Sequence, residues 1–120
     1  GIPVNFMGIC KSHPIEWQYY LWTDGFIHTK KGGMIILSNL ERIFHKRIQR
    51  KHIKMRQLPL INHNFIKQMI YHYLKKLTYL GHLNEIQKGK FQMNKSFSIP
   101  NNIEDMIKHE EEMEKKLYSE

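Results

Sequence analysis

The chain has 120 residues, which is the size of one domain with a core of its own. Its 41% hydrophobic and 12% aromatic content excludes a disordered chain, and no apolar run approaches the roughly 20 residues that a membrane-spanning helix needs. The formal net charge of +8 favours a polyanionic partner such as nucleic acid. Alanine is absent while Ile, Lys and Asn abound, which is typical of AT-rich coding bias, so the lysine count alone carries less weight.

The charge is unevenly distributed along the chain. Residues 1–100 hold 16 Lys and Arg against four acidic residues, a net charge of +12, whereas residues 101–120 hold three against seven, a net charge of −4. We therefore expect a basic domain over residues 1–100 and a separate acidic helix over residues 101–120. The alternative interpretation of the basic part is a solvated surface without a partner.

Two features of residues 1–10 indicate the cellular compartment: the absence of a signal-peptide pattern and the single cysteine. Residues 1–10 are apolar but lack the basic leader and small-residue cleavage site of a signal peptide. The single Cys10 excludes an internal disulfide and fits a reducing compartment. We expect an intracellular protein, in nucleus, cytoplasm or organelle matrix. The start at Gly1 rather than Met indicates a processed or trimmed chain and leaves open whether an upstream segment is missing.

The first quarter of the chain predicts a strand, a helix and a second strand. Apolar alternation over residues 2–6 favours a short strand. Pro14 suits a first helical turn, and a helix is expected over residues 15–26, with Trp17 and Trp22 as core aromatics rather than a base-stacking platform. After a turn at residues 30–33, residues 34–37 form a short buried strand.

The next helix is expected to be long and basic. Ser38 or Asn39 caps it, its apolar stripe includes Leu40 and Phe44, and it continues until Pro59 disfavours helical backbone. Residues 42–56 contain seven cations and no acidic residue. Each cation is a candidate phosphate contact: Arg42, Lys46, Arg47, Arg50, Lys51, Lys54 and Arg56.

Residues 64–80 predict a helix with two distinct faces. Apolar residues at i, i+3 and i+4 spacing, among them Ile66, Ile70, Leu74 and Leu77, form the buried face. The other face has no acidic residue and combines basic with aromatic groups, a combination that suits phosphates and bases. Its candidate nucleic-acid contacts are Lys67, Gln68, Tyr71, His72, Lys75 and Tyr79.

The chain continues with a hairpin and a last helix. Residues 83–93 predict a β-hairpin that turns at Lys88 and Gly89, and Lys88 and Lys90 are further candidate contacts. After an extended linker over residues 97–100, Asn101 or Asn102 caps an acidic helix. Its apolar stripe is expected to comprise Ile103, Met106, Ile107, Met113 and Leu117. Two interpretations stay open for this helix. It docks on the core, over the outer face of residues 64–80 or near residues 42–56, or it binds a partner helix.

These elements predict an α+β, mainly helical winged-helix fold: a three-helix core and a β-hairpin wing, with an N-terminal strand and a C-terminal acidic helix. Two families resemble parts of the pattern. Residues 6–11, Glu16-Trp17 and residues 34–40 resemble the second winged helix of the smallest ESCRT-II subunit, although the charge and the long basic helix differ. Tyr20-Leu21, residues 25–27 and Lys30-Lys31 resemble a ribosomal protein of the eS10 type.

Motifs for catalysis, nucleotide binding or metal binding do not stand out. Residues 31–33 and Gly81 form no phosphate-binding glycine pattern, and Cys10 with His13 lacks a second ligand pair for zinc. We therefore expect no metal, no cofactor, no small-molecule substrate and no enzymatic activity. The sequence predicts a DNA- or RNA-binding domain, including one that contacts RNA in a ribonucleoprotein; the alternative is a protein–protein module of a multisubunit assembly. Exposure of the outer face of residues 64–80 would favour nucleic acid.

Overall fold

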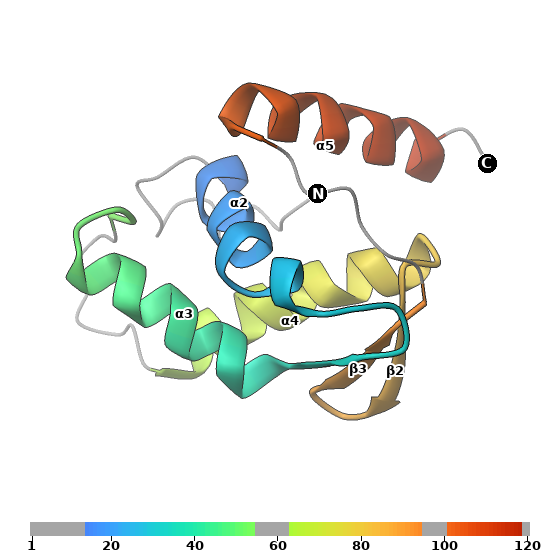
Figure 1. The fold of residues 1–120 in the computed structure, drawn as a ribbon, viewed down its shortest axis with the longest axis horizontal. Coiled ribbons are helices and arrows are strands. Elements are labelled where there is room, and N and C mark those ends of the chain that lie inside the picture. The colour runs from blue at the N-terminus through green and yellow to red at the C-terminus, as the bar shows by residue number, and fades with distance from the viewer. Residues whose placement is uncertain (1–13, 55–62, 95–100, 119–120) are drawn as a thin grey trace.

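The computed structural model describes residues 14–54, 63–94 and 101–118. In chain order these form helix α2 (Pro14–Asp24), the 3₁₀ helix η1 (Phe26–His28), strand β1 (Met34–Ile36), helices α3 (Leu37–Gln49) and α4 (His63–Tyr79), strands β2 (Leu83–Gln87) and β3 (Lys90–Met93), and helix α5 (Ile103–Tyr118). The predicted α+β, mainly helical class is confirmed (Figure 1). The strand predicted over residues 2–6 lies outside the described residues.

The sheet has three antiparallel strands in the order β1-β3-β2. Phe91 is the central residue, since it pairs with Ile35 on one side and with Glu85 on the other. The predicted hairpin is confirmed, with its turn at Lys88 and Gly89. Gly89 has φ 82°, a left-handed conformation that favours glycine. A bulge between Glu85 and Gln87 shifts the register near the turn.

The core lies between α2, α3 and α4, and one face of the sheet closes it. Trp17 is fully buried and meets Phe44 and Tyr73 edge-on, with ring centroids 5.9 and 5.5 Å apart. The prediction of the buried face of α4 is confirmed, because Ile66, Ile70, Leu74 and Leu77 are all at most 5% exposed. Leu83, Phe91 and Met93 extend this core into the hairpin.

Helix α2 ends two residues earlier than predicted because α3 approaches it closely. Gly25 donates its N–H to the Leu21 carbonyl at 2.9 Å, and Phe26 then begins η1. A Cβ at position 25 would lie only 2.8 Å from both the Leu21 carbonyl oxygen and Leu40 Cδ2. Glycine is therefore required where the two helices meet.

The prediction of Ser38 or Asn39 as the cap of α3 is wrong. Strand β1 runs directly into the helix, so Leu37 is its first residue, and Ile36 precedes it without a side-chain cap. The Leu37 N–H instead donates to the Gly89 carbonyl at 2.9 Å. The hairpin turn thus supplies the acceptor that a capping side chain otherwise would. The strand is also less buried than expected, since Met34 is 45% exposed.

The prediction of one long basic helix is also wrong. Helix α3 ends at Gln49, and Lys51 adopts a left-handed backbone with φ 63°. The N–H groups of Lys51 and His52 return to the carbonyls of Ile48 and Arg47, both at 2.9 Å, which closes the helix end. The turn allows Ile53 to enter the core at 1% exposure.

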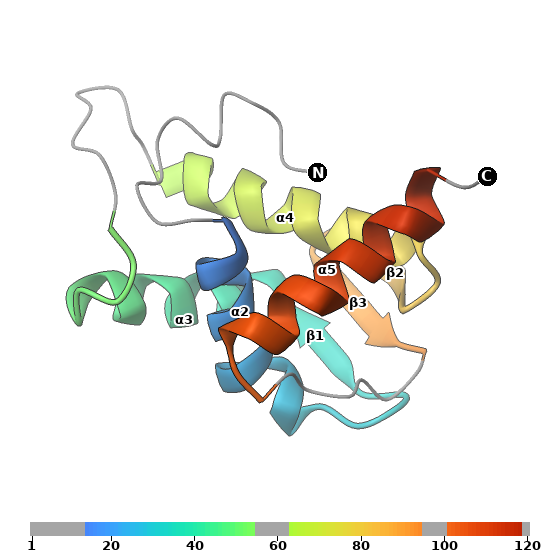
Figure 2. The same ribbon diagram turned by 90° about the horizontal axis from the view of Figure 1, so that it is seen from above.

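Helix α5 packs against α2 and the inner side of α4, at neither of the two predicted places (Figures 1 and 2). Asn102 caps it as predicted, because its Oδ1 accepts the Asp105 N–H at 2.9 Å. Met106 and Met113 are buried, but the prediction for Ile107 is wrong, since it is 39% exposed. Glu110, which was not part of the predicted stripe, is also buried, at 6% exposure.

Candidate nucleic-acid interface

The outer face of α4 forms one wall of a surface hollow of about 1000 Å³. The hairpin turn forms a second wall, and the junction of β1 with α3 forms a third. Three segments far apart in the sequence therefore meet here. The residues that line the hollow are Ile36, Leu37, Ser38, Asn64, Lys67, Gln68, Tyr71, His72, Lys75, Lys88, Gly89 and Lys90.

Basic groups surround this hollow. Lys67 and Lys75 project from α4, and Lys88 and Lys90 from the hairpin turn; all four side chains are exposed. Seven of the residues predicted as nucleic-acid contacts are thus brought together, since Gln68, Tyr71 and His72 also line the hollow. Tyr79 lies on α4 but does not line the hollow, and it is 66% exposed.

Glu85 was not predicted to belong to this surface, yet the hairpin places it against α4. Its carboxylate accepts hydrogen bonds from Tyr71 Oη at 2.6 Å and Lys75 Nζ at 3.0 Å, and from the Gly89 N–H at 3.4 Å. The hydrogen bond from Tyr71, followed by that from Lys75, lowers the pKa of the Glu85 carboxyl below its ordinary value. The same contact with Glu85 raises the pKa of Tyr71.

Glu85 divides the lysines of the hollow into two kinds. Lys75 is already paired, and the hydrogen bond to Glu85 raises its pKa. Lys67, Lys88 and Lys90 make no ion pair with any acidic residue in the described part of the chain. These three lysines are therefore the cations that remain available to an anionic ligand.

Tyr71 is held in place rather than presented to a ligand. Its hydroxyl is bound by Glu85, its ring packs edge-on against Phe91 at 6.0 Å, and the side chain is half-buried. The sequence prediction treated Tyr71 and Tyr79 alike as stacking residues. The structure places Tyr71, half-buried, in the lining of the hollow and leaves the Tyr79 ring at the surface.

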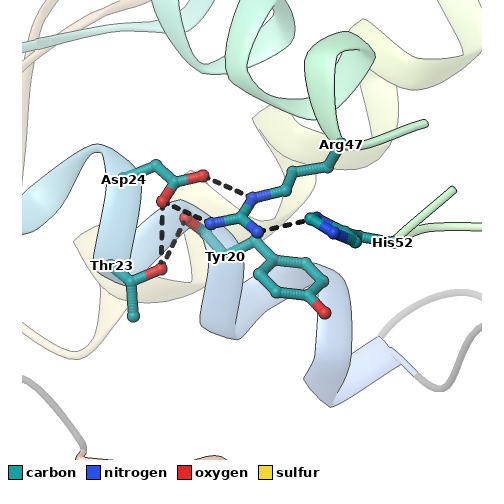
Figure 3. A network of polar contacts seen from close by, with 5 residues as sticks. All are labelled: Tyr20, Thr23, Asp24, Arg47 and His52. Carbon is teal, nitrogen blue, oxygen red and sulfur yellow. Dashed lines mark hydrogen bonds and ion pairs between the residues drawn. The ribbon is translucent and has the colours of Figure 1, made fainter. Parts of the chain in front are cut away.

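Arg47 of the basic run serves the fold (Figure 3). Its guanidinium forms a two-pronged bond with Asp24, both distances being 2.7 Å, lies 4.3 Å from the centre of the Tyr20 ring, and contacts His52 Nδ1 at 2.8 Å. The hydrogen bond from Arg47 lowers the pKa of Asp24, and the same bond raises the pKa of Arg47. Arg47 thereby joins the ends of α2 and α3.

The other cations of the run have different positions. Arg42 and Lys46 are exposed on α3, whereas Arg50, Lys51 and Lys54 are exposed on the turn that follows it. None of them lines the hollow. Arg56 lies outside the described residues.

Ser38 and Asn64 also line the hollow. Apart from their places at predicted helix starts, no sequence pattern indicates that they belong to a site. Among the described residues, no group of three or more His, Cys, Asp or Glu side chains is arranged to hold a metal ion. No helix in this part of the chain is long and apolar enough to cross a membrane.

Comparison with protein families relates the chain to one of them. The family model described as "Competence protein CoiA, C-terminal domain" matches residues 1–107. That match includes every element from α2 to β3 and the first turn of α5. Searches among curated proteins and among solved structures found no match.

Proposed function

This chain belongs to the family of CoiA C-terminal domains, and we propose that it is a non-enzymatic DNA-binding domain of the winged-helix type. Competence is the capacity of a cell to take up DNA, so DNA is the nucleic acid that the family description favours. The observation that carries the proposal is the hollow beside α4, where three unpaired lysines from two walls face the same space.

The order of the elements supports a winged-helix arrangement. One helix, a short strand and two further helices precede a hairpin, and β3 lies between β1 and β2. In such domains the outer face of the third helix and the hairpin both lie toward the nucleic acid. Here the corresponding elements are α4 and the β2–β3 hairpin, which are two walls of the hollow.

The charges support DNA more than a protein partner. Among the described residues that line the hollow none is acidic, and Glu85 beside it is already paired with Lys75 and accepts two further hydrogen bonds. Lysine is depleted from the centres of protein interfaces, because its desolvation is costly, whereas phosphates are its natural partners. A protein–protein module that uses the same face is the alternative.

Lys67→Glu with Lys88→Glu tests the proposal without breaking a known contact. Both residues are exposed and neither is part of an ion pair described above, so the domain should stay folded. We expect at least about a tenfold loss of affinity for DNA, because each lysine contributes a phosphate contact and each glutamate repels one. Fluorescence anisotropy with labelled DNA at several salt concentrations measures the effect.

Lys108→Glu with Lys115→Glu is the matched control. These lysines are exposed on α5, away from the hollow, and the change in net charge is the same. Equal losses in the two double variants would show that only total charge matters and would contradict the site. Wild-type affinity for RNA well above that for DNA would contradict the choice of DNA. Normal DNA binding by Lys67→Glu with Lys88→Glu, together with a lost protein partner, would support the alternative.

A further inference from the structure

The less exposed residues that line the hollow differ chemically from the exposed ones. Ile36 and Tyr71 are half-buried, Leu37 is 4% exposed, and together with Gly89 they form a largely apolar part of the lining. The lysine side chains of the lining are exposed. A site for phosphates alone needs only the lysines, so the apolar part of the lining indicates that a less polar part of the ligand also enters.

A base with its sugar and phosphates combines these properties. Its flat apolar faces suit Tyr71 and the aliphatic residues, while its edge can pair with the side-chain amides of Asn64 and Gln68. Both amide side chains are exposed, and neither has a hydrogen-bond partner among those found in the described residues. Apolar platforms within a positively charged groove are typical of sites for single-stranded nucleic acid.

A duplex fits this surface less well. In a duplex the faces of the bases are stacked on one another, and only their edges are accessible from the grooves. A helix reads those edges by entering the major groove, which is about 12 Å wide. The outer face of α4 is instead set between the hairpin turn and the start of α3, where it forms the side of a concavity.

We propose that the hollow binds single-stranded DNA, with a base against Ile36, Leu37 and Tyr71 and the flanking phosphates on Lys67, Lys88 and Lys90. This inference rests on the proposed function and specifies the form of DNA that the site takes. Tyr71 is then a positioning residue as well as part of the apolar lining, because its bond to Glu85 fixes the hairpin against α4.

Three ligands test the inference with the unaltered chain. They are a labelled single strand of about 12 nucleotides, its duplex, and a strand of equal length in which abasic residues replace the central nucleotides. We expect the single strand to bind at least about tenfold more tightly than the duplex at equal salt. The abasic strand, which has the same phosphates, should bind about 5- to 100-fold more weakly than the intact strand, as expected for lost stacking of a base.

A pair of matched variants locates the strand in the hollow. Gln68→Glu adds one negative charge inside it, and Asn101→Asp adds the same charge at an exposed position before α5, outside it. Only Gln68→Glu should weaken binding of the single strand, by about tenfold because its carboxylate repels the adjacent phosphates. Equal effects of the two variants would overturn the placement.

The outcomes separate the inference from the function on which it rests. Equal or tighter binding of the duplex, or undiminished binding of the abasic strand, would overturn the inference and leave a DNA-binding domain of another mode. Failure to bind any of the three ligands would overturn the proposed function itself.

Discussion

At the scale of single residues, the cations that were predicted as phosphate contacts are of two chemically different kinds. Arg47 is paired with Asp24, whereas Lys67, Lys88 and Lys90 form no ion pair with any acidic residue that the structure describes. A residue's charge alone therefore does not identify it as a phosphate contact. The prediction from the sequence included all of these cations as equals, because the partner of Arg47 lies 23 residues away and no local pattern indicates it.

Arg47→Lys is expected to destabilise the fold although it keeps the charge. Lysine cannot reproduce the two-pronged bond to Asp24 or the flat contact over Tyr20. The free energy of unfolding should fall by about 1–2 kcal/mol, since hydrogen bonds between charged groups are lost at a position only 19% exposed. Urea unfolding followed by circular dichroism measures this change.

Arg50→Lys provides the comparison at the adjoining end of α3. Arg50 is exposed, so its replacement should change the free energy of unfolding by less than about 0.5 kcal/mol. A similar cost for both substitutions would mean that Arg47 has no special structural role.

At the scale of elements, α5 is held to the domain by a buried polar cluster. Trp22 Nε1 donates to Tyr73 Oη at 2.6 Å, Tyr73 Oη donates to Glu110 at 3.3 Å, and Lys76 pairs with Glu110 at 3.4 Å. Burial is the main cause that raises the pKa values of both Tyr73 and Glu110. His109, the neighbour of Glu110, packs edge-on against Trp22 with ring centroids 4.7 Å apart.

His109 should make the attachment of α5 sensitive to acid. Burial lowers its pKa from the ordinary value of 6.5, so the unfolded chain binds this proton more readily than the folded one. The contribution of neutral His109 to the free energy of unfolding is therefore fully present above pH 6.5. It is lost as the pH falls toward the lowered pKa. His109→Phe keeps a ring against Trp22 but removes the titration, so urea unfolding at about pH 7.5 and about pH 5.5 should differ less in the variant.

The exposed His28 offers the matched control, because His28→Phe also removes one imidazole. Glu110 titrates in both proteins and its raised pKa favours the folded state in acid, so it acts in the opposite direction and cancels in the comparison. An unchanged pH dependence in His109→Phe would show that this imidazole does not control the docking of α5.

The sequence predicted those elements whose form depends on local periodicity. The apolar spacing of α4 and the turn at Lys88 and Gly89 were sufficient to identify this helix and hairpin. The start of α3 was missed because the acceptor for its first N–H comes from Gly89, in a distant segment. Likewise, the stripe on α5 indicated an amphipathic helix but could not reveal that Glu110 would enter the core opposite Lys76. Of the site, one wall was predicted in detail, while Glu85 was missed because its contacts depend on how the hairpin folds back.

At the scale of the whole molecule, acidic and basic groups are separated in space. Helix α5 turns its methionines inward and presents Glu104, Glu111, Glu112 and Glu114 to solvent. It lies at the top of Figure 1, whereas the hairpin that borders the hollow lies at the bottom. The acidic helix therefore does not cover the basic hollow. A polyanion that approaches from the side of the hollow meets a positive field.

The basic surface extends beyond the hollow along α3. Arg42 lies one helical turn after Ser38, which lines the hollow, and Lys46 and Arg50 follow at the same spacing. All three cations are exposed. A strand that leaves the hollow at Ser38 would thus meet one cation in each successive turn of the helix.

A triple variant that neutralises these cations should therefore weaken DNA binding and reduce its salt dependence. Its substitutions are Arg42→Gln, Lys46→Gln and Arg50→Gln. If each cation neutralises one phosphate, the slope of log affinity against log salt should become less steep by about 0.7 per contact on a single strand, or about 2 in total. Neutralising Lys30, Lys108 and Lys115, which are exposed elsewhere, should leave the slope unchanged. An unchanged slope in the α3 variant would show that the binding surface is confined to the hollow and that the exposed cations of α3 are only solvated.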